Sequence, residues 1–317
     1  MIDADAAQVL TSEGWVRSRP VTPKDGSAMA GLRALVEPNK GQMRGPSARP
    51  AFDGIMLRVP APEGVSFEAG VVGGIAGWWC WVADTTPGRA ILHLHGGWYN
   101  WGTAHAFRHL VGHIAVRAGA DAFIPDYRLA PEHPFPAAPH DVQACYRGLA
   151  DMGHRVAVVG DSAGGGLALG LLPVLAAQAK APVGAVALSP VTDLTLAGAS
   201  WASRAAADPY FTKDQVKTLV DAYLAGHDPS DPLASPLYAE LSGLPPIRLH
   251  VGDDEVLLDD SRVYVDRAVA AGVDATLDVW NGMPHGFLSG VGRVAAADHA
   301  LAAIGAFLSE RFEKGGS

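Results

Sequence analysis

The chain has 317 residues, of which 49% are hydrophobic and 18% charged, and its formal net charge is −9. This hydrophobic fraction supports one large core or two modest ones and argues against extended disorder. The negative charge, without any basic run interleaved with aromatic residues, argues against nucleic acid or an anionic membrane surface as a partner.

The cysteines and the apolar runs restrict the cellular setting. Cys80 and Cys145 are too few for a disulfide framework and favour a reducing compartment. The first residues, MIDADAAQVL, are acidic and lack the basic and apolar regions of a secretory signal. The longest apolar run, 164–179, is too short to cross a bilayer and contains Pro173, so we predict a buried helix there. These features predict a soluble, cytoplasmic protein.

From about residue 65 onward, short apolar runs alternate with longer helical patterns. Strands are predicted at 90–97, 121–128, 155–162, 183–190, 247–254 and 276–282. Helices are predicted at 103–118, 139–151, 162–180, 212–225, 260–272 and 294–313. The alternation predicts an α/β fold with a mostly parallel central sheet flanked by helices on both faces. Ligands bind such sheets at the carboxyl ends of the strands.

Two segments stand outside this alternation. Residues 1–60 are rich in proline, glycine and charge, with one helical stretch at 28–36, and the connection 191–246 is too long for a simple crossover. We predict that about 1–48 and 191–236 form a helical cap. The catalytic core would then comprise about 49–190 and 237–317 of a single domain.

The strand at 90–97 ends in the tetrapeptide His95-Gly96-Gly97-Trp98. An acyl-transfer enzyme needs backbone N–H donors for its oxyanion, and glycines allow the close approach that this requires. His93 and His95 alternate as strand residues do, and no third zinc ligand lies near them. The histidines at 105, 109 and 113 have the spacing of one partly solvated helix face. We therefore predict no metal and no cofactor.

Ser162 lies in the pattern G-x-S-x-G, between an apolar strand and an apolar helix. A sharp strand-to-helix turn needs small neighbours, which Gly160 and Gly164 supply, and it exposes the serine above the sheet. The alternative is a glycine-rich turn that only packs a helix onto its strand. A dinucleotide-binding turn is disfavoured because the G-x-G-x-x-G spacing is absent. The context favours a nucleophile.

His285 lies in the loop that follows the last predicted strand, in the sequence WNGMPHGF. A general base for the serine must reach the serine hydroxyl, and a loop at the strand ends suits that role. Its place late in the chain completes the order Ser, acid, His that is used in folds of this kind. A histidine that only caps or packs the loop is the structural alternative.

Several stretches together resemble the hormone-sensitive-lipase-like branch of the α/β-hydrolases: HGG, DYRLAPEHPFPAA, GDSAGG, DEVLLDD and PHG, in this order. The resemblance covers about residues 65–317 and implies a Ser-His-acid esterase with a helical cap. It also implies oxyanion donors at the N–H groups of Gly97, Trp98 and Ala163. Trp98 stands where the family usually has a third glycine, so we expect its indole to narrow the acyl or alcohol pocket.

The family's acid usually precedes the histidine by about thirty residues, and counting back from His285 by that number reaches Glu255. Asp254 requires a one-residue shift but has the commoner residue type, so it remains the alternative acid, with Asp253 as a third option. Asp259 and Asp260 begin the next predicted helix, where carboxylates are ordinary first-turn residues.

These features predict a serine carboxylesterase that cleaves small to medium esters or lactones through an acyl-enzyme. An acyltransferase on the same scaffold and, less favoured, a non-catalytic ligand-binding module are the alternatives. The expected partner is a small-molecule ester, and a homodimer formed by pairing of final strands is one open arrangement.

Overall fold

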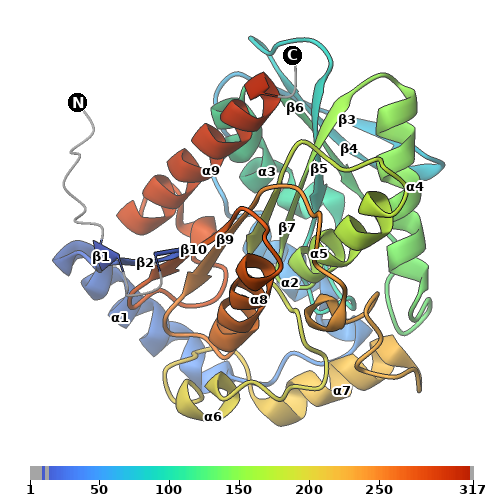
Figure 1. Cartoon of the computed structure of the whole chain (residues 1–317). Coiled ribbons are helices and arrows are strands. Elements are labelled where there is room, and N and C mark those ends of the chain that lie inside the picture. The colour runs from blue at the N-terminus through green and yellow to red at the C-terminus, as the bar shows by residue number, and fades with distance from the viewer. Residues whose placement is uncertain (1–8, 11–13, 315–317) are drawn as a thin grey trace.

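A computed structural model describes residues 9–10 and 14–314 (Figure 1). These residues form one ten-stranded sheet in the order β1-β2-β10-β9-β8-β7-β5-β6-β4-β3. The strands are β1 Val9–Leu10, β2 Val16–Arg19, β3 Val65–Val72, β4 Ile75–Val82, β5 Arg89–Leu94, β6 Asp121–Pro125, β7 Arg155–Asp161, β8 Ala185–Leu188, β9 Ile247–Gly252 and β10 Ala275–Trp280. The α-helices are α1 Pro23–Val36, α2 Arg49–Met56, α3 Ala104–Ala118, α4 Ala137–Asp151, α5 Ala163–Ala176, α6 Ser200–Ser203, α7 Lys213–Leu224, α8 Leu258–Ala270 and α9 Ala295–Lys314. Short 3₁₀ helices occur at η1 Glu37–Asn39, η2 Pro46–Ala48, η3 Pro236–Tyr238 and η4 Phe287–Gly290.

The central part of the sheet is parallel. Strands β10, β9, β8, β7, β5 and β6 run in one direction, and β2 is parallel to β10. Among the described strands, the pairs β1–β2, β4–β6 and β3–β4 are antiparallel. The predicted α/β-hydrolase fold with a mostly parallel central sheet is confirmed.

Helices cover both faces of this sheet. Successive residues of β5 point to opposite layers, so Ile91 packs with α3 and α9, whereas Leu92 packs with α4 and α5. The apolar run at 164–179 forms most of α5, which contains Pro173 and is buried along nearly its whole length. Strands buried on both faces explain why these segments read as continuous apolar runs.

The N-terminal segment contributes a strand that the sequence did not indicate. Strand β2 pairs with β10, and Arg19 forms an ion pair with Asp278 at 2.7 Å. Strand β10 therefore lies inside the sheet, between β9 and β2, and its edge is not free to pair with a second copy. A homodimer remains a prediction, but it would need another surface.

The N-terminal segment and the 191–236 segment meet at the end of the sheet where the parallel strands finish, with α1, α6 and α7 along it (Figure 1). The Gly41 amide donates to the Tyr210 carbonyl at 2.9 Å, and the Gln215 side chain donates to the Met43 carbonyl at 2.7 Å. We propose that these two segments form the cap. Among the described residues, no helix has the length and apolar character needed to cross a membrane.

Candidate active site

Ser162 lies at the turn between β7 and α5, with a φ of 55° and a ψ of −120°. Its amide donates to the Leu188 carbonyl at 2.8 Å, which fixes the turn against β8. A Cβ on Gly160 would lie 2.2 Å from the Gly164 carbonyl oxygen, and one on Gly164 would lie 2.0 Å from the Leu94 carbonyl oxygen. Only glycine fits at these two positions, so the G-x-S-x-G spacing is a steric requirement of this turn.

The loop that follows β5 packs directly against the serine turn. The Gly96 amide donates to the Asp161 carboxylate at 3.0 Å, and a Cβ on Gly96 would lie 2.4 Å from that carboxylate. The Tyr127 hydroxyl donates to the His95 carbonyl at 2.6 Å, and the Tyr127 and His95 rings stack. These contacts hold the loop backbone at a fixed distance from Ser162.

The backbone N–H groups that were predicted as oxyanion donors are available to a substrate oxygen. Within the described chain, the N–H groups of Gly97 and Trp98 donate no hydrogen bond. Ala163 is the first residue of α5, so its N–H has no partner within the helix. The macrodipole of α5 adds partial positive charge at that end.

The indole of Trp98 is buried and packs against the 191–236 segment. Its ring meets that of Phe211 edge-on at 5.4 Å and lies 6.4 Å from that of Trp201. Trp98 has a φ of 51°, a backbone conformation that glycine adopts without strain. The indole also lines the cavity at Ser162. A Trp98 side chain that narrows the pocket would have to lie there.

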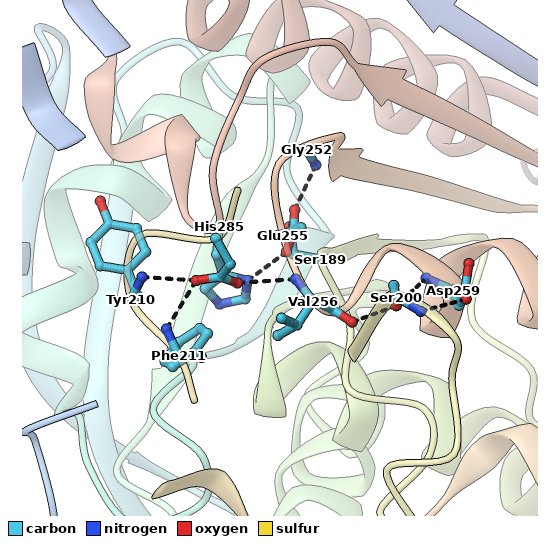
Figure 2. A network of polar contacts seen from close by, with 10 residues as sticks. Ser189, Ser200, Tyr210, Phe211, Gly252, Glu255, Val256, Asp259 and His285 are labelled. Atoms are coloured by element: carbon cyan, nitrogen blue, oxygen red, sulfur yellow. Dashed lines mark hydrogen bonds and ion pairs between the residues drawn. The ribbon is translucent and has the colours of Figure 1, made fainter. Parts of the chain in front are cut away.

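Glu255, which is fully buried, pairs with His285, which is partly exposed. The Nδ1 atom of His285 lies 2.7 Å from Oε2 of Glu255, so Nδ1 carries the proton and Nε2 is left as the basic nitrogen (Figure 2). The other oxygen of Glu255 accepts from the Ser189 hydroxyl at 2.7 Å and from the Gly252 amide at 2.6 Å. The carboxylate is thus held by three donors.

The remaining four carboxylates of this region contact the predicted cap. Asp254 pairs with Arg33 of α1, and Asp253 pairs with Arg204 at 2.8 Å. In the first turn of α8, Asp259 accepts from the Ser200 amide at 2.8 Å and Asp260 from two amides of the 191–236 segment. First-turn capping was predicted for Asp259 and Asp260, but both also hold that segment.

These groups surround a cavity of about 330 Å³. Ser162, His285, Gly97, Trp98 and Asp161 all line it. The rest of its wall is largely apolar and comes from both cap segments and the core: Leu35, Val36, Met43, Phe52, Ile55, Met56, Trp101, Phe107, Leu110, Leu188, Pro209, Tyr210, Phe211 and Leu288. Helix α2, which the predicted boundary at residue 48 assigns to the core, also contributes to this wall.

The electrostatics of the cavity favour a histidine cation. Burial alone lowers the pKa of His285, but the carboxylates of Glu255, Asp208 and Asp161 outweigh burial, and the pKa is raised. Burial raises the pKa of Asp161 to about 7, although His285 and the Gly96 amide oppose that shift. His95 is neutral, since burial lowers its pKa to about 4.

Two further polar residues at this site were not identified from the sequence. Ser189 binds Glu255 and lines the cavity, and Asp161 holds Gly96. Ser189 follows β8 and Asp161 ends β7. Their position at the carboxyl edge of the sheet was the sequence signal that could have identified them.

Comparison with known proteins bears on the fold and on the class of reaction. The family model described as alpha/beta hydrolase fold matches residues 91–289. The chain is 43% identical over 202 residues to an acetyl-hydrolase of Streptomyces hygroscopicus, covering 62% of this chain and 68% of that protein. It is 34% identical over 230 residues to an esterase of Acinetobacter venetianus, covering 71% and 76%. A crystal structure of an esterase from the bacterial hormone-sensitive lipase family superposes with a TM-score of 0.85 at 37% identity, covering 92% of this chain and 98% of the other.

The fold and these relatives define an α/β-hydrolase that acts on carboxylic esters. Within that class, the chain belongs to the hormone-sensitive-lipase-like family of carboxylesterases.

Proposed function

We propose that the protein hydrolyses small to medium carboxylic esters through an acyl-enzyme formed on Ser162, with His285 as general base and Glu255 as the triad acid. The observation that carries this proposal is the hydrogen-bonded Glu255–His285 pair, whose imidazole lines one cavity with Ser162, Gly97 and Trp98.

In the first half-reaction, Oγ of Ser162 bonds to the ester carbonyl carbon while Nε2 of His285 takes the hydroxyl proton. The negative charge that develops on the carbonyl oxygen accepts hydrogen bonds from the N–H groups of Gly97, Trp98 and Ala163. The C–O bond to the alcohol then breaks, and the alcohol leaves with the proton from His285.

In the second half-reaction, water attacks the acyl carbon and gives its proton to His285. The acid leaves as the bond to Ser162 breaks, and the serine regains its proton. Glu255 keeps the imidazole in the required tautomer and stabilises its cation in both steps.

The cavity favours a compact apolar substrate. Its volume of about 330 Å³ and its aliphatic and aromatic wall suit a short or medium acyl chain. The acetyl-hydrolase name of one relative supports the short end of this range. A lactone of similar size presents the same carbonyl chemistry.

Turnover of p-nitrophenyl esters from acetate to laurate by the wild type and by Ser162→Ala tests the proposal. We expect short esters to turn over and Ser162→Ala to lose at least about 10³-fold in kcat. Mass spectrometry after treatment with an organophosphonate should show one adduct on the peptide that contains Ser162.

Full activity of Ser162→Ala, or an adduct on another residue, would contradict the proposed nucleophile. Product analysis with added alcohol identifies transfer to that alcohol, which would favour an acyltransferase instead.

A further inference from the structure

Asp208 is a fully buried carboxylate in the stretch between α6 and α7. One of its oxygens accepts from the amides of Tyr210 at 2.8 Å and Phe211 at 2.9 Å. The other accepts from the amide of Val256 at 3.0 Å. The three amides, at labelled residues of Figure 2, thus converge on a single side chain.

The three amides belong to two segments beside His285: the turn that carries Glu255, and the stretch with Tyr210 and Phe211. Val256 directly follows Glu255, so the hydrogen bond from its amide to Asp208 fixes the turn that carries Glu255. Tyr210 and Phe211 form part of the cavity wall, and the Phe211 ring meets the His285 ring edge-on at 5.1 Å. Asp208 therefore joins the cap to both members of the Glu255–His285 pair.

Only a carboxylate suits this position fully. All three contacts come from N–H donors, and an ionised carboxylate accepts at both oxygens. An asparagine could accept the two amides of the cap, but its NH₂ group would face the Val256 amide as a second donor. Substitution by asparagine therefore removes the contact to the acid turn together with the charge.

The charges around His285 come from several elements. Glu255, Asp208 and Asp161 supply negative charge from the β9–α8 loop, the cap and the end of β7. On the cap side, Lys40 binds the backbone carbonyl of Asp208. Two guanidinium groups of the cap are paired with other carboxylates, Arg33 with Asp254 and Arg204 with Asp253.

We propose that Asp208 is a positioning residue for ester hydrolysis, which fastens the cap to the acid turn and adds negative charge beside His285. This inference rests on the proposed function, because it assigns Asp208 a role only if His285 is the base. Asp208 contacts no reacting atom and acts through Glu255, Val256 and Phe211.

The sign of the pH effect follows from the charge. A neighbouring carboxylate stabilises the His285 cation and so raises the pKa of His285. The free enzyme needs neutral His285, so kcat/KM falls as the pH drops through this pKa. Removal of the Asp208 charge lowers the pKa, and the acid limb of kcat/KM moves to lower pH. At the same time kcat falls, because the cation formed during the reaction is less stabilised.

The experiment measures kcat and kcat/KM against pH for the wild type, Asp208→Asn and Asp193→Asn, with a p-nitrophenyl ester. Asp193 is a matched control, because it is a buried aspartate of the 191–236 segment that accepts two backbone amides and contacts neither Glu255 nor His285. We expect Asp208→Asn to move the acid limb down by about 0.5–1 pH unit and to lower kcat about 10- to 100-fold. The acid limb of Asp193→Asn should match that of the wild type.

Asp208→Glu keeps the charge but displaces it by one methylene, and it serves as the test if the asparagine variant does not fold. This variant should keep the acid limb of the wild type with a reduced kcat. An unchanged limb in a folded Asp208→Asn, or a lowered limb in Asp208→Glu, would overturn the role of Asp208. Ser162→Ala, assayed in parallel, separates that result from failure of the proposed function, because only the latter leaves Ser162→Ala active.

Discussion

Glu255 and Asp254 are neighbours in sequence, yet their surroundings differ completely. Glu255 is fully buried and accepts from His285, Ser189 and the Gly252 amide. Asp254 is partly exposed and pairs with Arg33 of α1. A carboxylate that orients an imidazole must be ionised and fixed, and Glu255 alone of these two contacts His285.

Separate substitutions distinguish the two acids. Glu255→Gln keeps the size of the side chain but removes its charge and places an NH₂ group near Nδ1 of His285. We expect kcat to fall about 10³- to 10⁴-fold, since the wrong tautomer is favoured. Asp254→Asn breaks only a partly exposed ion pair, so kcat should stay within about threefold of the wild type. Steady-state kinetics of both variants on one ester measure these effects. A larger loss of kcat in Asp254→Asn than in Glu255→Gln would make Asp254 the acid.

Trp98 combines a donor amide with a large side chain in the cavity. Trp98→Gly keeps the N–H group and relieves the positive φ, but it removes the indole from the wall shared with Phe211. We expect the preference for octanoate over acetate esters to rise at least about tenfold, because a single methylene already contributes that much in an apolar pocket. Trp81→Leu is the control, since Trp81 stacks on Trp79 of β4 and does not line the cavity. An unchanged chain-length profile for Trp98→Gly would show that the indole does not limit the pocket.

The sequence predicted the residues whose spacing is set locally. Ser162 follows from its glycine neighbours, and His285 from its place after the last strand. The structure brings both to one cavity and pairs His285 with Glu255, while their catalytic roles remain a prediction. Asp208 carries no such local pattern, because its contact with Val256 joins positions 48 residues apart.

At the level of elements, α1 and α9 are joined by one buried carboxylate. Asp25 accepts from the amides of Ala295 at 2.9 Å and Ala296 at 3.0 Å, which are the first residues of α9. The first amides of a helix have no partner within it, so Asp25 caps α9 from a distant part of the chain.

Asp25→Ala should therefore lower the free energy of unfolding by about 1–2 kcal/mol, because two buried amides lose their acceptor. Activity at temperatures well below the melting transition should persist, since Asp25 does not line the cavity. Thermal or urea denaturation measures the change. Asp214→Ala is the control, because Asp214 is 85% exposed in its ion pair with Arg44 and should have little effect. Equal stability of the two variants would contradict the capping role.

The elements that were predicted share strong periodicity. The central strands are buried on both faces and read as apolar runs, and the predicted helices around them begin and end within a few residues of their patterns. Strand β2 has the sequence VRSR, and the residues of β3 are exposed or half-buried except for the buried Val72. Neither carries an apolar run. Strand β2 is placed by its pairing with β10, which is distant in the sequence, whereas β3 pairs with the neighbouring β4 and forms the edge of the sheet, so much of its surface faces solvent.

At the scale of the whole molecule, many contacts hold the proposed cap against the core. Four carboxylates of the 253–260 region hold α1 and the 191–236 segment. The Phe211 ring of that segment also contacts the rings of Trp98 and His285, which belong to the predicted core. The cavity wall also includes Leu35 and Ile55, which are 70% and 48% exposed, so the cavity reaches solvent with the cap in place.

A cap held in this way should not require a lipid surface to open. With tributyrin, we expect the initial rate to saturate smoothly with concentration and to show no step at the solubility limit, because substrate enters past Leu35 and Ile55 without displacement of α1 or α7. A pH-stat assay across that limit measures this directly. A rate that rises severalfold only above the limit would mean that the carboxylate contacts break at an interface, and the cap would then act as a lid. The double variant Arg33→Met with Arg204→Met, which removes two of those contacts, shows whether their loss produces such a step.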